Sequence, residues 1–219
     1  MPRGHYKIIL DLEFNPVRDP AIREFARHEI IEIGAVKLND SLETVSQFSQ
    51  YIRPQYNDLE ENIAKLTGIT PETLRDAPDF DTGMTNFMNW IGSEPFSLYS
   101  WSGSDRAVMQ HEIDLKYPDD TRYDIFFVHW IDLQKIYQRE MGFSKSMGLT
   151  NALGTFRINF KGTEHGALAD AINTAEVMRY ISSREKMEKI KRSSVTFNQA
   201  SESAGFSVGS IPIKTRKRK

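Results

Sequence analysis

One short stretch near the N-terminus, residues 7–14 with the sequence K-I-I-L-D-L-E-F, limits the possible folds of this chain most strongly. Its run of aliphatic residues predicts a buried central strand. Side chains two apart on a strand point to the same face, so we expect Asp11 and Glu13 on one side and Leu12 on the other. Two such carboxylates repel each other unless a cation lies between them, and a divalent metal ion is the simplest candidate. The alternative is a strand that ends at Leu10, with both acids in water at the edge of the sheet.

The composition is that of an ordinary globular protein, with 39% hydrophobic and 26% charged residues among 219. The chain has no cysteine, which excludes disulfides and thiolate metal sites. No apolar run approaches the ~20 residues that span a bilayer, and residues 1–6 lack the hydrophobic segment of a signal peptide. We therefore expect a cytoplasmic protein without membrane association, and the oligomeric state stays open.

The net charge of −2 hides an uneven distribution of charge along the chain. Residues 184–219 carry ten Lys or Arg against three Glu, which leaves 18 basic and 27 acidic residues in residues 1–183. A body with this excess of acid repels a polyanion unless metal ions or local basic patches intervene. The chain ends in K-T-R-K-R-K, and this basic cluster either helps to hold nucleic acid or acts as a solubilising end.

Alternating strand and helix patterns predict a mixed α/β sheet covered by helices. Strands are expected at residues 7–14, 28–38, 45–52 and 96–101, and the short connections between the first three indicate an antiparallel meander. Helices are expected at residues 60–66, from Pro71, from a cap at Asp81 or Thr82 to Ile91, and over 105–116, 131–141, 149–156 and 166–181. Residues 1–185 are predicted to form one domain, and residues 186–219 a helical extension followed by a flexible basic tail.

Two further acids and one histidine fall beside predicted strand ends and helix starts, where α/β folds gather their sites. Asp105 follows a strand at the mouth of a helix, and taken alone this position favours a helix N-cap over a site residue. Asp170 lies five residues after His165 at the start of the long helix, and its alternative is an exposed acid stabilised by the helix dipole. Together, the three acidic segments suit Mg²⁺ or Mn²⁺, with the imidazole of His165 left free as a base.

The ordered set D-x-E, a distant Asp after a strand, and H-x-x-x-x-D resembles the DEDDh 3′-to-5′ exonucleases of the DnaQ-like, ribonuclease H-like superfamily. Within that group, the chain is most similar to the Eri-type RNA-trimming enzymes and to bacterial sporulation-inhibitor-type relatives. The flanking sequences that carry the likeness are H-E-I-I-E-I-G-A-V from residue 28, Q-Y-I-R-P from 50, L-T-G-I-T from 66 and A-D-A-I-N-T-A from 169. The likeness covers residues 6–182 and implies an α/β fold with a ribonuclease H-like mixed five-stranded sheet, a three-strand antiparallel meander plus parallel strands, flanked by helices.

The resemblance also implies a role for each acid. Asp11, Glu13 and Asp170 would bind one divalent metal ion, Mg²⁺ or Mn²⁺. Asp11 would also touch a second ion, on which Asp105 would act partly through water. His165 would be the general base that takes a proton from the attacking water. Two ions ~4 Å apart stabilise both the attacking and the leaving oxygen of a phosphodiester displacement, and imidazole titrates near neutrality.

Leu12 and Phe14 flank the acids and are the candidate substrate-binding residues. Phe14 either wedges against the terminal base, since stacking tolerates any base, or packs in the core. The chain departs from the Eri-type pattern at three places without losing a ligand: Ser104 stands before Asp105, Ala169 before Asp170, and Phe14-Asn15 after D-x-E. These departures concern substrate preference more than activity.

The hypothesis is a metal-dependent 3′-to-5′ exonuclease that releases nucleoside 5′-monophosphates from single-stranded 3′ ends, with RNA favoured over DNA. One alternative is the same chemistry on DNA, as in proofreading or repair. The other is a regulatory protein that uses this fold only to bind nucleic acid, because fold alone does not guarantee activity. The intact set of acids and histidine argues against this last alternative.

Overall fold

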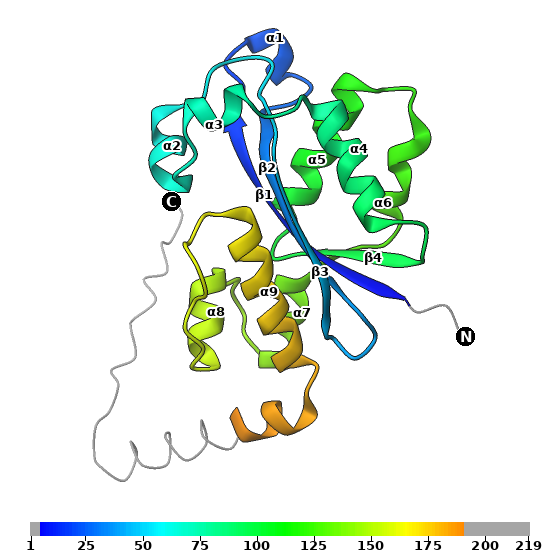
Figure 1. The fold of residues 1–219 in the computed structure, drawn as a ribbon. Coiled ribbons are helices and arrows are strands. Elements are labelled where there is room, and N and C mark those ends of the chain that lie inside the picture. Colours follow the sequence, from blue (N-terminus) through cyan, green and yellow to red (C-terminus); the bar gives the residue numbers. More distant parts are fainter. Residues whose placement is uncertain (1–4, 191–219) are drawn as a thin grey trace, which may run out of the picture. The chain divides into compact units, whose positions relative to one another are not determined.

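A five-stranded mixed sheet forms the centre of the fold (Figure 1). The computed structural model describes residues 5–190. The strands are β1 (Tyr6–Pro16), β2 (His28–Leu38), β3 (Thr44–Tyr51), β4 (Phe96–Ser100) and β5 (Trp130–Asp132). Their order across the sheet is β3-β2-β1-β4-β5, with antiparallel pairing from β3 to β1 and parallel pairing from β1 to β5. The predicted antiparallel meander followed by parallel strands is confirmed.

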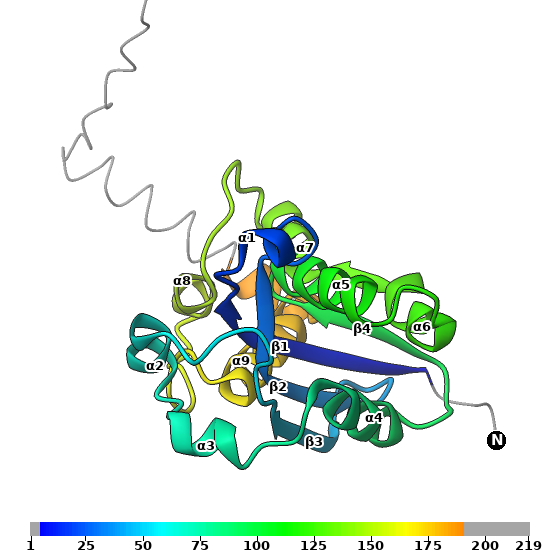
Figure 2. The same cartoon turned by 90° about the horizontal axis from the view of Figure 1, so that it is seen from above.

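Helices cover both faces of this sheet. They are α1 (Pro20–Arg23), α2 (Glu61–Thr67), α3 (Pro71–Arg75), α4 (Phe80–Ile91), α5 (Ser104–Lys116), α6 (Asp124–Val128), α7 (Leu133–Met141), α8 (Leu149–Thr155) and α9 (Ala167–Ile181), with a 3-10 turn, η1, at Thr121–Tyr123. Figure 1 shows α4, α5 and α6 grouped on one side of β1 and α7, α8 and α9 on the other, and Figure 2 shows the same elements from above. The predicted helices at 105–116 and 166–181 are confirmed.

β1 is the middle strand, and it is buried on both faces. Ile8, Leu10 and Leu12 belong to the hydrophobic cluster that also contains the buried side chains of α4 and α5. The alternation of a strand turns Ile9 to the other face, where α9 packs against β1 and β2. Each of these buried aliphatic side chains stabilises the fold by about 1.5–3 kcal/mol. The same alternation directs Asp11 and Glu13 to the α9 face.

The predicted start of α4 is two or three residues too late. The cap is Asp79, whose side chain accepts the N–H of Thr82 at 3.0 Å, and not Asp81 or Thr82. An Asp side chain can accept the backbone N–H three residues further along the chain, wherever a helix begins. The sequence alone therefore does not distinguish Asp79 from Asp81 as the cap. The packing of Phe80 into the core selects Asp79.

The predicted helix from Ile131 begins later in the structure, at Leu133. Trp130–Asp132 instead form β5, which pairs in parallel with β4. A strand of three residues has no periodicity of its own, so only its pairing partner decides its conformation. Asp132 then caps α7 by accepting the N–H of Lys135 at 3.1 Å.

The chain divides into two units, residues 1–181 and 182–219, and the strands and labelled helices all belong to the first. Residues 184–190 of the second unit are helical. The predicted domain boundary at residue 185 stays a prediction, and the predicted basic tail lies outside the described residues. None of the helices described between residues 5 and 190 has the length and apolar character needed to cross a membrane.

Candidate active site

Asp11 and Glu13 lie inside a continuous strand and not beyond its end. β1 runs to Pro16 and pairs with β2 along its whole length, with a bulge between Glu13 and Phe14. The alternative that the strand stops at Leu10 is therefore wrong. Both acids lie on the face of the sheet that α9 covers, so they are held in a partly desolvated place by rigid backbone.

Asp105 reaches the same place from α5. Its carboxylate is only 6% exposed, and Oδ1 accepts the backbone N–H of Leu12 at 3.2 Å. This bond joins the first turn of α5 to β1 between the two strand acids. The N-cap residue of α5 is Gly103, so the alternative reading of Asp105 as a helix cap is wrong.

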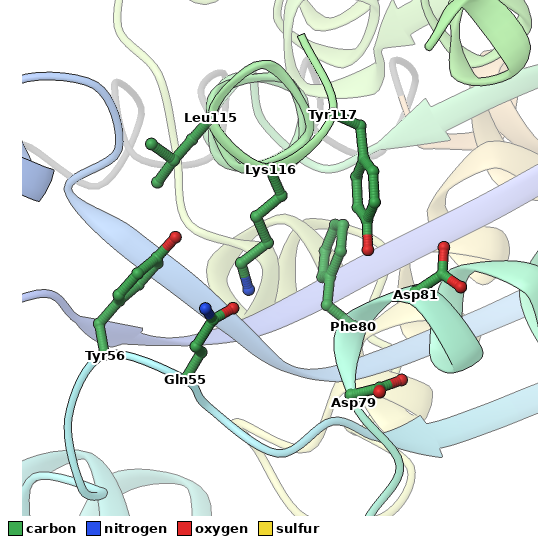
Figure 3. Close-up of a pocket in the computed structure, with 8 residues that line it drawn as sticks. All are labelled: Gln55, Tyr56, Asp79, Phe80, Asp81, Leu115, Lys116 and Tyr117. Atoms are coloured by element: carbon green, nitrogen blue, oxygen red, sulfur yellow. The ribbon is translucent and has the colours of Figure 1, made fainter. Parts of the chain in front are cut away.

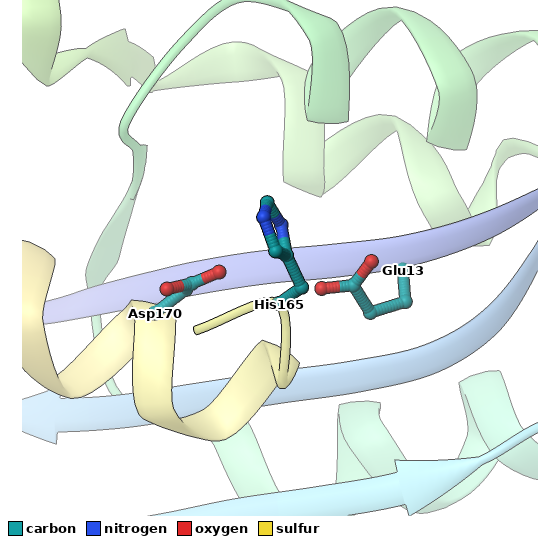
Figure 4. A group of neighbouring side chains, drawn as sticks. All are labelled: Glu13, His165 and Asp170. Atoms are coloured by element: carbon teal, nitrogen blue, oxygen red, sulfur yellow. The ribbon is translucent and has the colours of Figure 1, made fainter. Parts of the chain in front are cut away.

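His165 and Asp170 approach from the other side of the site, at the start of α9. His165 has a backbone φ of +64°, a left-handed conformation in which the chain turns towards α9. Asp170 lies in the first turn of that helix and is half-buried. Ligand-capable atoms of Glu13, His165 and Asp170 all lie within 4.8 Å of one another. Figure 4 shows the imidazole between the two carboxylates.

Burial raises the pKa of all four carboxylates of the site, and repulsion between them adds to this for Asp11, Glu13 and Asp105. Burial, followed by repulsion from Asp170 and Glu32, raises the pKa of Glu13 from 4.5 to about 8. Burial also raises the pKa of Asp170 to about 6, against the opposing effect of the His165 charge. The pKa values of Asp11 and Asp105 are raised by burial first and then, in both cases, by repulsion from Asp170 among other acids.

Ionising every carboxylate of such a cluster costs free energy, because like charges repel in a place with little water. A cation among the carboxylates offsets this cost. Within residues 5–190, the acids on β1, α5 and α9 offer hard oxygen donors, which are the ligands that Mg²⁺ and Mn²⁺ prefer. The residues present therefore fit divalent ions of this class. The exposed imidazole of His165 lies at the rim of the cluster, where it can meet solvent or substrate.

Glu32 is a fifth acidic residue at the site, in addition to the four acids predicted from the sequence. It pairs directly with Glu13 in the β1–β2 register, is 5% exposed, and accepts the N–H of Ala167 at 3.2 Å. It therefore joins β2 to the start of α9. Two residues on, Gly34 lies so close to α9 that an added Cβ would stand 2.0 Å from the backbone nitrogen of Leu168. In the sequence, Glu32 is marked only as a glutamate within a predicted buried strand. Its pairing with Glu13 depends on the register of β1 against β2, which exists only in the folded sheet.

The two predicted substrate-binding residues differ in accessibility. The Leu12 side chain is 3% exposed and packs in the core, while its backbone N–H is bonded to Asp105. Phe14 is partly buried, and its ring lies edge-on to the ring of His28 with the centroids 5.0 Å apart. A substrate contact by either residue stays a prediction.

A cavity of about 350 Å³ lies apart from this acidic cluster, between α4, α5 and the segment after β3 (Figure 3). Its polar centre is Lys116, which forms ion pairs with Glu29 at 3.4 Å and Glu112 at 2.7 Å. The ammonium group also lies 4.7 Å from the centre of the Phe80 ring. None of the predicted site residues lines this cavity, and its lysine is already paired with two glutamates, so it is not the candidate active site.

Comparisons with known proteins identify a matching family and relatives that are named exoribonucleases. A family model described as an exonuclease, RNase T, matches residues 8–178. The chain is 29% identical to 3′-5′ exoribonuclease 1 of Rattus norvegicus over 187 residues, which cover 80% of this chain and 52% of the rat protein. It is 30% identical to ERI1 exoribonuclease 2 of Homo sapiens, with 78% of this chain and 27% of that protein covered. The chain thus spans about half or less of the length of these two relatives.

Two further similarities cover most of the protein compared. DNA polymerase III subunit epsilon of Rickettsia typhi is 30% identical over 172 residues, which cover 78% of this chain and 71% of that protein. Among solved structures, the nuclease domain of 3′hExo, described as a DEDDh family member bound to rAMP, is 28% identical with a TM-score of 0.68. That comparison covers 81% of this chain and 92% of the nuclease domain.

Proposed function

The chain belongs to the RNase T exonuclease family, and on that basis we propose that it releases nucleoside 5′-monophosphates from single-stranded 3′ ends, from RNA more readily than from DNA. The observation that carries this proposal is the convergence of Glu13, His165 and Asp170 within 4.8 Å. These residues come from the central strand and from the start of α9, more than 150 positions apart in the chain. An acidic cluster with an accessible imidazole at its rim suits hydrolysis of a phosphodiester.

The proposed cofactors are two divalent ions, Mg²⁺ or Mn²⁺, held by Asp11, Glu13, Asp105 and Asp170. The raised pKa values of these acids support this, because burial and, for Asp11, Glu13 and Asp105, repulsion from neighbouring acids disfavour the charged carboxylates, and a bound cation offsets both effects. When bound, such ions act as Lewis acids on the phosphodiester and make a water molecule more acidic. The protein's own contribution is to hold the four carboxylates on rigid elements, β1, α5 and α9.

His165 is the proposed general base. It accepts a proton from the attacking water as the new P–O bond forms and the bond from phosphorus to the 3′ oxygen breaks. The shortened strand keeps that oxygen as a hydroxyl, protonated from solvent. Burial raises the pKa of Asp170, and the charge and backbone of His165 oppose this shift. Phe14 and the backbone of Leu12 are the proposed contacts to the terminal nucleotide.

RNA is the favoured substrate because one relative is named an exoribonuclease, and because the 3′hExo domain, which this chain covers almost completely, is bound to the ribonucleotide rAMP. DNA is the second candidate, and the similarity to a DNA polymerase III subunit favours it. RNA recognition requires contacts to the 2′-hydroxyl, so the two candidates differ in a measurable way.

The test is a degradation assay on two matched twenty-nucleotide strands, one RNA and one DNA, each labelled at the 5′ end. Mg²⁺, Mn²⁺ and EDTA are compared for the wild type and for Asp11→Asn. Asp114→Asn is the matched control, because Asp114 is an exposed acid on α5 outside the cluster. We expect a ladder that shortens from the 3′ end, requires metal, disappears in Asp11→Asn and persists in Asp114→Asn. A folded wild type that shortens neither strand would refute the proposal and leave the binding-only alternative.

A further inference from the structure

The loop that joins β1 to β2, residues 17–27, has a firmly held backbone. Val17 and Ala26 are each 1% exposed, and the N–H of Val17 donates to the carbonyl of Arg27 at 2.9 Å. Asp19 caps α1 within the loop by accepting the N–H of Ala21 at 2.9 Å. Side chains that point outward from this loop are therefore presented in a defined arrangement.

Three of these side chains are exposed and without a partner in the fold. Phe25 is 64% exposed, although burying a phenylalanine side chain would stabilise the fold by about 1.5–3 kcal/mol. Arg23 and Arg27 are exposed on either side of it, and neither guanidinium forms a hydrogen bond or ion pair with any residue between 5 and 190. Arg18 of the same loop differs, because it pairs with Glu60.

The exposed residues lie beside the candidate active site. His28, the first residue of β2, contacts the ring of Phe14, which directly follows Glu13. Arg27 directly precedes His28 in the chain, and burial, followed by the charges of Arg23 and Arg27, lowers the pKa of His28. Figure 1 shows α1 at the ends of β1 and β2.

We propose that Arg23, Phe25 and Arg27 form a contact surface for the part of the single-stranded substrate upstream of its 3′-terminal nucleotide. The two guanidinium groups contact phosphates, and one base stacks on Phe25. Residues 1–183 carry 27 acidic and 18 basic residues, so a polyanion approaches only where cations are free, and these arginines supply them beside the site. Stacking on an aromatic side chain accepts any base, which suits an enzyme that shortens a strand stepwise. The inference rests on the proposed function for the position of the 3′ end.

The test measures binding by fluorescence anisotropy of a labelled twenty-nucleotide strand in EDTA, over a series of salt concentrations. For Arg23→Ala/Arg27→Ala, we expect the slope of log K against log salt to become shallower by about 1.4, since each lost phosphate contact on a single strand contributes ~0.7. For Phe25→Ala, we expect Kd to rise about 5- to 150-fold with an unchanged slope. Arg139→Ala is the control, because it removes an exposed arginine from α7, which lies well below α1 in Figure 1.

Strand length separates this surface from the catalytic cluster. A dinucleotide is too short to extend from the cluster to the loop, so we expect the ratio of Kd, loop variant over wild type, to rise with length from two to twenty nucleotides. If the loop variants bind the twenty-nucleotide strand with an unchanged Kd, the inference is overturned; a loop that binds a protein partner instead would give this result. An equal loss of affinity at every strand length would also overturn it. If the wild type hydrolyses nothing but the loop variants still bind more weakly, the proposed function fails and the loop inference stands.

Discussion

Gly34→Ala tests whether the contact between β2 and the start of α9 sets the geometry of the active site. The added Cβ would lie 2.0 Å from the nitrogen of Leu168 and 2.1 Å from the carbonyl carbon of Ala167. An ordinary contact needs about 3.4 Å, so the start of α9 must move by about 1.4 Å. Both neighbours are backbone atoms, which cannot rotate away as a side chain can.

The displaced segment carries His165, two positions before Ala167, and Asp170, two positions after Leu168. A misplacement of about 1 Å in a catalytic group costs about 100-fold in rate. We therefore expect Gly34→Ala to lower kcat by about 100-fold, while overpacking lowers the free energy of unfolding by about 1–3 kcal/mol. Release of mononucleotides from a labelled strand measures the first quantity, and urea unfolding the second.

Gly154→Ala is the matched control, because an added Cβ there meets nothing within 4 Å. Gly154 lies in α8, where alanine is favoured over glycine by up to about 1 kcal/mol, so this variant is expected to be as stable as the wild type or more so, with full activity. If Gly34→Ala instead retains kcat within two-fold and unfolds at the wild-type urea concentration, the close approach of β2 and α9 does not set the site geometry.

Two further predictions concern the titratable groups of the site. His165→Ala is expected to lower kcat by about 100- to 10,000-fold while metal binding, measured by calorimetry, stays largely intact. His111→Ala, at an exposed histidine of α5, is the control. If His165→Ala turns over substrate within a few-fold of the wild-type rate, His165 is not the general base. The raised pKa of Glu13 means that the native state holds more protons than the unfolded state between about 4.5 and 8, so the free energy of unfolding in EDTA should fall as the pH rises through this range. Melting temperatures with EDTA and with Mg²⁺ check this, since bound metal should flatten the dependence; a metal-free stability that rises with pH over the same range contradicts it.

Much of the architecture could be predicted because it depends on local patterns. The hydrophobic run of β1 and the β-branched residues of 28–38 specify buried strands whatever else the chain does, and β2 has the predicted bounds. The comparisons confirm the predicted resemblance to DEDDh exonucleases and the ribonuclease H-like sheet. Alternation along β1 was enough to place Asp11 and Glu13 on one face. The roles of the five predicted site residues stay predictions.

Tertiary structure alone decided the features that depend on which elements meet. Glu32 became a neighbour of Glu13 through the β1–β2 register, and Gly34 allows the close approach of α9, although nothing in their local sequence indicates either contact. β5 is a strand because β4 lies beside it, not because of its own three residues. The cluster of acids likewise depends on the folded structure. Its members are spread over about 160 residues, and they raise each other's pKa only because packing brings their carboxylates close together where little water reaches.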